Sequence, residues 1–168
     1  MEQRFSQSRR QFLLAGASVA STLSIGSLAE AATELVVIVH PDNTQSPSPR
    51  DIEAIFRTTL RHWPDGGGIV AFNLVPGSEE RVSFDRAVLR LTPGEVSRYW
   101  IDRKIRGGES PPRSVPNPLL VVRLVRDLRS AIGYVPAALA PSGVRVIARV
   151  QGPALVGAGV WPRDVKDV

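Results

Sequence analysis

Residues 34–40 read Glu-Leu-Val-Val-Ile-Val-His, a short and almost uninterrupted run of β-branched and other apolar side chains. Such a run is typical of a strand that is covered on both faces of a sheet, because its apolar residues do not alternate with polar ones. Pro41-Asp42-Asn43 follows directly and ends the run. We therefore expect a buried strand here, and its two covering layers must come from the rest of the chain.

Three more apolar, β-branched runs indicate further short strands. They are residues 69–75, 131–135 and 144–147. Turn-forming glycine, proline and serine residues lie close to these runs, as expected for strand ends. The last stretch, residues 152–168, shows no sustained hydrophobic period. We expect that tail to be irregular.

Four segments carry the signals of a helix N-terminus. Ser48-Pro49-Arg50-Asp51 and Thr92-Pro93-Gly94-Glu95 are capping boxes with proline at the first helical position, and Ser78 and Asn117 are candidate N-caps. Apolar residues then recur on one face of each segment. The predicted helices are residues 49–60, a helix after Ser78, a helix from Pro93 to the glycine pair at 107–108, and a helix after Asn117.

Strands and helices alternate along most of the chain, which favours an α/β fold. We expect three layers, with a mostly parallel sheet of four to five strands and helices on both faces. The length suits a single domain.

Composition excludes several kinds of function. The 168 residues include no cysteine, so neither a disulfide framework nor a thiolate metal site can form. His40 and His62 stand apart without a His-x-x-x-His pair, and no nucleophile elbow or phosphate-binding loop motif occurs, so we expect no metal, no cofactor and no catalysis. The net charge is +5, but the arginines form no long run, which argues against nucleic acid as a partner.

The N-terminus carries an export signal. Ser8-Arg9-Arg10-Gln11-Phe12-Leu13-Leu14 departs from the twin-arginine consensus only at Leu14, and Ala29-Glu30-Ala31 supplies the small residues that signal peptidase accepts. We expect residues 1–31 to be a twin-arginine signal peptide and residues 32–168 to be a single periplasmic domain. The later chain has no apolar stretch long enough to span a bilayer, so we expect no membrane span after cleavage.

Four segments together resemble the periplasmic phosphate-binding proteins of ABC transporters. They are Val36 to Asn43, the helix that ends in Ile55-Phe56, Trp63-Pro64-Asp65-Gly66, and Ala131-Ile132-Gly133-Tyr134-Val135. The resemblance implies a type II periplasmic binding protein fold, in which two α/β lobes close on an anion held by helix N-termini and hydroxyl groups. This chain has room for one lobe, a single-lobe short form.

The resemblance and the residue chemistry together give a set of candidate ligand-binding residues. Gly77 and Ser78 precede a helix, where free backbone N–H groups and a hydroxyl suit an oxyanion, although a plain N-cap explains them equally well. The family's Ser-Gly-Thr turn reads Gly77-Ser78-Glu79 here. Arg81 lies one turn later. The remaining candidates are Asn43 and Thr44, after the first strand, and Arg106 and Ser110, in a loop that also reads as a helix C-cap and linker.

Two functions are compatible with these residues. The first is an extracytoplasmic solute-binding protein that resembles the phosphate-binding component of an ABC transporter and binds an inorganic oxyanion without catalysis. Its protein partner would be a transporter permease or another envelope protein. The alternative is a degenerate single lobe that acts as an envelope interaction or sensing module and transports no ligand.

Overall fold

The computed structural model describes residues 34–140, 142–151 and 154–157. The expected signal peptide at residues 1–31 lies outside the described residues, as does most of the tail at 152–168. Within the tail, residues 154–157 form a strand, so the expectation of an entirely irregular tail was wrong. That strand pairs antiparallel with the strand before it. Its four residues are too few to show a hydrophobic period in the sequence.

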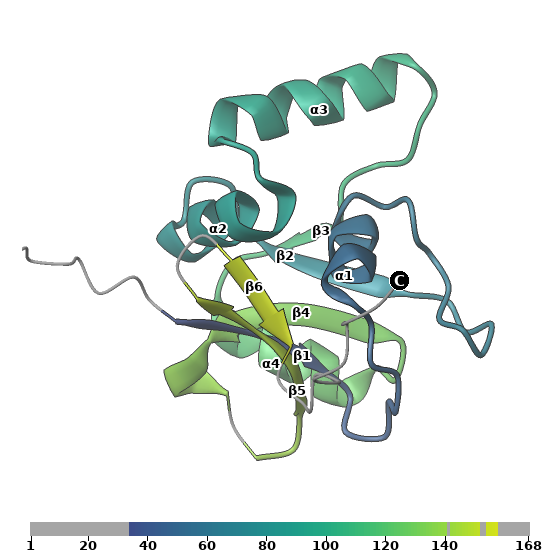
Figure 1. The fold of residues 1–168 in the computed structure, drawn as a ribbon, viewed down its shortest axis with the longest axis vertical. Helices are drawn as coiled ribbons and strands as arrows, with labels where there is room; N and C mark the ends of the chain where they lie inside the picture. Colours follow the sequence, from purple (N-terminus) through teal and green to yellow (C-terminus); the bar gives the residue numbers. More distant parts are fainter. Residues whose placement is uncertain (1–33, 141, 152–153, 158–168) are drawn as a thin grey trace, which may run out of the picture.

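The sheet has six strands in the order β3-β2-β4-β1-β5-β6 (Figure 1). The strands are β1 Leu35–Val39, β2 Val70–Leu74, β3 Arg113–Val115, β4 Ala131–Pro136, β5 Arg145–Gln151 and β6 Ala154–Gly157. Strand β1 lies inside the sheet and all five of its residues are buried, as its sequence predicts.

The sheet is mixed, which corrects the expectation of a mostly parallel sheet of four to five strands. Strand β1 is antiparallel to both of its neighbours, β4 and β5, and β5 is antiparallel to β6. Only β2 runs parallel to its partners, β3 and β4. Hydrophobic patterns reveal that a strand is buried but carry no information about the direction of a partner far along the chain.

The helices begin where the capping residues predict. They are α1 Pro49–Phe56, α2 Glu79–Phe84, α3 Pro93–Ile105 and α4 Pro118–Asp127, with Ser48, Ser78, Thr92 and Asn117 as their N-caps. Helix α2 continues directly into a π-helical turn, η1 Asp85–Leu89. A short 3-10 turn, η2 Ala137–Leu139, follows β4. Helix α1 ends four residues earlier than the sequence suggests, just before Thr58, whose φ of 57° is incompatible with a right-handed helix.

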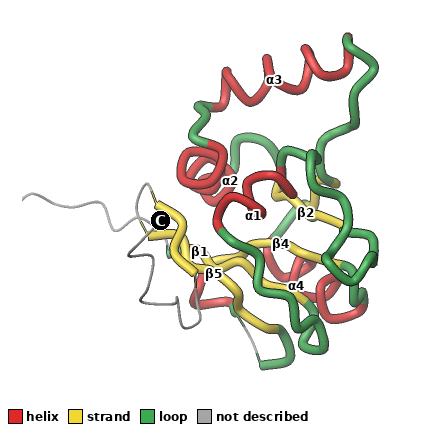
Figure 2. Tube along the Cα trace, turned by 45° about the vertical axis from the view of Figure 1, so that its right-hand side comes forward, coloured by secondary structure: helices red, strands yellow, loops and turns green. Residues whose placement is uncertain are grey.

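Helices cover both faces of the sheet, which confirms the expected α/β layering (Figures 1 and 2). Helix α4 packs on one face, where Val121 and Val125 approach Gly133 of β4. On the other face, Tyr134 stacks on Phe84 of α2 with ring centroids 3.7 Å apart and meets Phe56 of α1 edge-on at 5.8 Å. Adjacent residues of β4 therefore anchor opposite layers, since strand side chains alternate between faces.

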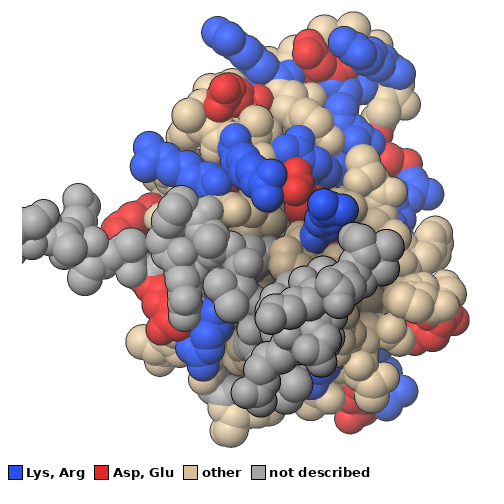
Figure 3. All heavy atoms as spheres, viewed as in Figure 1, with Lys and Arg blue, Asp and Glu red and all other residues tan. Residues whose placement is uncertain are grey.

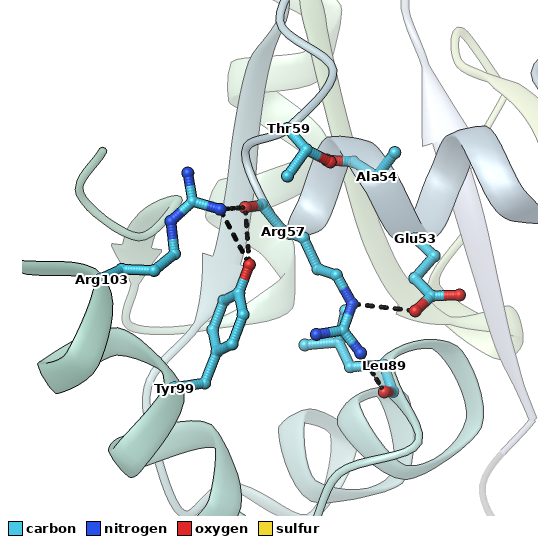
Figure 4. Close-up of polar contacts among 7 residues, drawn as sticks. All are labelled: Glu53, Ala54, Arg57, Thr59, Leu89, Tyr99 and Arg103. Atoms are coloured by element: carbon cyan, nitrogen blue, oxygen red, sulfur yellow. Dashed lines mark hydrogen bonds and ion pairs between the residues drawn. The ribbon is translucent and has the colours of Figure 1, made fainter. Parts of the chain in front are cut away.

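Helix α3 stands apart from the sheet and is held by polar contacts at the end of α1 (Figures 1 and 4). The carbonyl oxygen of Arg57 accepts hydrogen bonds from the Tyr99 hydroxyl at 3.3 Å and from Arg103 Nη1 at 3.1 Å. The Arg57 guanidinium in turn binds Glu53 and the Leu89 carbonyl oxygen. These contacts join α1, η1 and α3, and Val96 of α3 adds an apolar contact with the core.

Replacement of Gly133 by alanine tests the packing of α4. A Cβ atom at Gly133 would lie 2.5 Å from Cγ1 of Val121, and valine has little rotamer freedom with which to move away. We expect Gly133→Ala to lower the free energy of unfolding by about 1–3 kcal/mol, as overpacked cores do. Urea denaturation followed by circular dichroism measures this change. Gly94→Ala is the control, because a Cβ there meets no atom within 4 Å, and an equal loss in both variants would contradict the packing argument.

Candidate functional site

A polar corner forms where β2 ends and α2 begins. Gly77 has a φ of +87°, which turns the chain, and a Cβ atom there would meet no atom within 4 Å. Ser78 caps α2, and its Oγ accepts a hydrogen bond from the Arg81 backbone N–H at 3.2 Å. The backbone N–H groups of Glu79 and Glu80 have no acceptor among the described residues. The corner therefore presents unpaired donors at a helix N-terminus, where the partial positive charge favours an anion.

Arg81 lies behind this corner and is already paired. Its residue is 6% exposed, its Nε donates to Oδ2 of Asp85 at 2.6 Å, and its Nη1 donates to the Leu74 carbonyl oxygen at 3.1 Å. Burial raises the pKa of the Asp85 carboxyl, while the charge of Arg81 opposes that rise. The ion pair neutralises most of the charge that Arg81 would offer to an anion.

A second buried network supports the same corner. The Tyr134 hydroxyl donates to Oδ1 of Asn73 at 2.8 Å and accepts from the Leu74 backbone N–H at 3.3 Å. Burial raises the pKa of this hydroxyl well above its usual value, so it stays protonated. Sequence analysis missed Asn73, Asp85 and Tyr134 as parts of the site. Only the i, i+4 spacing of Arg81 and Asp85 could have indicated an ion pair.

Asn43 and Thr44 lie at the opposite end of the strands from Gly77. Because β1 is antiparallel to β4, the residues that follow Val39 leave the sheet where β2 and β4 begin, whereas Gly77 follows the end of β2. Asn43 is buried, and its Oδ1 accepts from the Gln45 backbone N–H. The antiparallel pairing of β1 with β4 therefore separates Asn43 and Thr44 from Gly77, Ser78 and Arg81, so the candidates do not form one site.

Arg106 and Ser110 are exposed at the far end of α3. Arg106 is the C-cap of this helix. Its N–H donates to the Asp102 carbonyl oxygen and the Gly107 N–H donates to the Lys104 carbonyl oxygen, which matches the alternative interpretation as a helix end. A cavity of about 180 Å³ lies between Gly77 and α3, and neither Arg106 nor Ser110 lines it. Of the seven predicted ligand-binding residues, the structure brings together Gly77, Ser78 and Arg81.

The described residues hold no group of three or more His, Cys, Asp or Glu side chains placed to bind a metal ion. Within the same part of the chain, no helix is long and apolar enough to cross a membrane.

Comparison with known proteins shows which solved structures this architecture resembles. No family model and no curated protein matches the sequence. The structure is similar to an ABC-type phosphate transport receptor from Vibrio cholerae, with a TM-score of 0.52 and 16% identity over 67% of this chain and 44% of that one. The chain resembles one lobe of a phosphate-binding protein.

A phosphate ABC transporter substrate-binding protein from Clostridium perfringens, solved with bound phosphate, gives the same result. Its TM-score is 0.53 and its identity 17%, over 68% of this chain and 45% of that one. This chain thus spans less than half the length of the two solved proteins. The likeness establishes the fold and confirms the resemblance predicted from the sequence, and the span agrees with a single lobe.

Removal of the Arg81 guanidinium tests whether the corner depends on its ion pair. Arg81→Met leaves the Asp85 carboxylate buried without its partner and the Leu74 carbonyl oxygen without a side-chain donor. We expect the free energy of unfolding to fall by about 3–5 kcal/mol, measured by urea denaturation. The control is Arg149→Met, which breaks an exposed pair with Glu34 and should change stability by no more than about 0.5 kcal/mol. A loss below about 1 kcal/mol in Arg81→Met would show that the pair is not structural.

Proposed function

We propose that this chain is an extracytoplasmic solute-binding protein of the phosphate-binding type, which holds an inorganic oxyanion non-covalently at the Gly77–Ser78 corner. The proposal rests on the backbone N–H groups of Glu79 and Glu80 at this turn, which have no acceptor among the described residues. The Ser78 hydroxyl can donate to the same ligand, because the capping bond uses only its acceptor capacity.

The surface charge supports an anionic ligand. Lys and Arg side chains gather over α3 and the helices beneath it, with acidic residues among them (Figure 3). Exposed arginines in this part of the chain include Arg86, Arg90 and Arg98. A positive potential over this face would raise the local concentration of a small anion.

The remaining parts of the proposal follow from the sequence and the fold. We propose that the twin-arginine signal delivers residues 32–168 to the periplasm as one domain. There the domain binds its ligand without catalysis. The solved proteins that share its fold are named as a transport receptor and a substrate-binding protein, which supports this part of the proposal. Its partner is a transporter permease or another envelope protein, since one lobe cannot enclose an anion from both sides.

Calorimetric titration with phosphate and sulfate tests the oxyanion proposal. We expect saturable heat with the wild-type domain, and an affinity roughly ten- to a hundredfold lower in Ser78→Ala, which removes a hydrogen bond to a charged ligand. Ser48→Ala is the matched control. Ser48 caps α1 as Ser78 caps α2, so each variant should lose about 1 kcal/mol of stability, but only Ser78→Ala should lose affinity.

The absence of heat with either anion would reject the oxyanion proposal and favour the alternative, a single lobe that serves as an envelope interaction or sensing module. Two observations favour that alternative. Asp85 already occupies the Arg81 guanidinium. In addition, Ile101 and Ile105, one turn apart on the outer side of α3, are 58% and 78% exposed and could contact a protein partner.

A further inference from the structure

A cavity of about 510 Å³ lies where β2 begins, at the end of that strand opposite Gly77. Strand β3 pairs with β2 only from Phe72 onward, so no strand of the described sheet lies beside Val70 and Ala71 on that side. The residues around this space come chiefly from the end of α1 and the segment after it, the start of β2, and the loop after α3. None of the seven predicted ligand-binding residues lines it.

Apolar residues form much of the lining. Ile55 of α1 is buried, and Pro111 and Pro112 contribute their rings. Four further apolar residues of the lining are only partly buried and keep accessible surface: Leu60, Ile69, Val70 and Ala71. An apolar group of a ligand that covers this surface removes it from water, which favours binding.

Two half-exposed side chains of opposite charge line the same cavity. The Arg61 guanidinium forms an ion pair with Oε1 of Glu109, and the two side chains are 53% and 51% exposed. Arg61 is held next to the start of β2, because its carbonyl oxygen accepts a hydrogen bond from the Ile69 N–H at 2.8 Å. Glu109 belongs to the loop after α3. The two charges therefore lie in contact with each other and within reach of solvent.

An exposed ion pair of this kind contributes little to stability, because water screens both charges. A ligand can therefore replace each partner at little cost. It needs an anionic group for Arg61 and a cationic group for Glu109, and these groups must be neighbours because the two side chains touch. A carboxylate matches the planar fork of a guanidinium, and an ammonium group donates to a carboxylate. An α-amino acid carries both groups on one carbon atom.

We propose that this cavity binds a free α-amino acid with an apolar side chain, such as leucine. The α-carboxylate binds Arg61, and the α-ammonium group binds Glu109. The apolar side chain packs against the partly buried residues at the start of β2. This site shares no residue with the oxyanion corner and does not depend on the function proposed for it.

Two-dimensional ¹H–¹⁵N NMR of the protein, titrated with L-leucine, tests this proposal. We expect saturable shifts of the Ile69, Val70 and Ala71 backbone N–H signals in the millimolar range. Three further probes each lack one feature of leucine: glycine has no apolar side chain, N-acetyl-leucine has no ammonium group, and leucinamide has no carboxylate. Each should bind more weakly than leucine. No saturable shift with leucine, or equal affinity for any of the three probes, would overturn the proposal.

Arg61→Gln and Glu109→Gln test the two charge contacts separately. Both side chains are half exposed, so we expect each variant to fold as the wild type does. The affinity for leucine should fall roughly two- to fivefold in each, which is the value of one exposed ion pair. Glu109→Gln should also bind N-acetyl-leucine more tightly than the wild type does, because Arg61 then has no competing carboxylate partner.

The matched controls are Glu34→Gln and Arg149→Gln, which break another exposed ion pair whose residues do not line the cavity. We expect both controls to bind leucine as the wild type does. Unchanged leucine affinity in either Arg61→Gln or Glu109→Gln would overturn the proposal, as would an equal loss in the controls. Phosphate calorimetry is a separate measurement, so either proposal can fail alone.

Discussion

The antiparallel pairing of β1 with both β4 and β5 is the constraint on which the rest of the structure depends. It places the most apolar strand inside the sheet, with helices covering both faces. It also decides which loops meet, because the chain leaves β1 at one end of the strands and leaves β2 and β4 at the other end. Asn43 and Thr44, which follow β1, are thereby separated by the length of a strand from Gly77 and Ser78, which follow β2.

Polar contacts within the protein occupy most of the side chains at the corner after β2. Arg81 donates to Oδ2 of Asp85 and to the Leu74 carbonyl oxygen, and Tyr134 joins Asn73 to the same strand end. What remains for a ligand is the backbone N–H groups of the turn and the Ser78 hydroxyl. An anion held there would rely on dipoles more than on net charge, which suits weak, exchangeable binding by an isolated lobe.

Helix α3 gives this lobe a feature of its own. Its attachment through Tyr99 and Arg103 to the end of α1 leaves a partly apolar space between it and the sheet. Two buried polar atoms of residues beside that space, Oδ1 of Asp85 and Nε1 of Trp100, lack partners among the described residues, although buried polar groups in proteins are nearly always paired. The same helix exposes Ile101 and Ile105 to solvent.

The sequence by itself determined the local structure: the capping residues Ser48, Ser78, Thr92 and Asn117 start their helices as predicted, and the run at 34–40 is buried. These signals are local, because a cap acts within one turn and a burial pattern within one strand. Strand direction, the pairing of Arg81 with Asp85 and the cavity under α3 were decided only by the tertiary structure. Each depends on segments or side-chain orientations that no short stretch of sequence encodes.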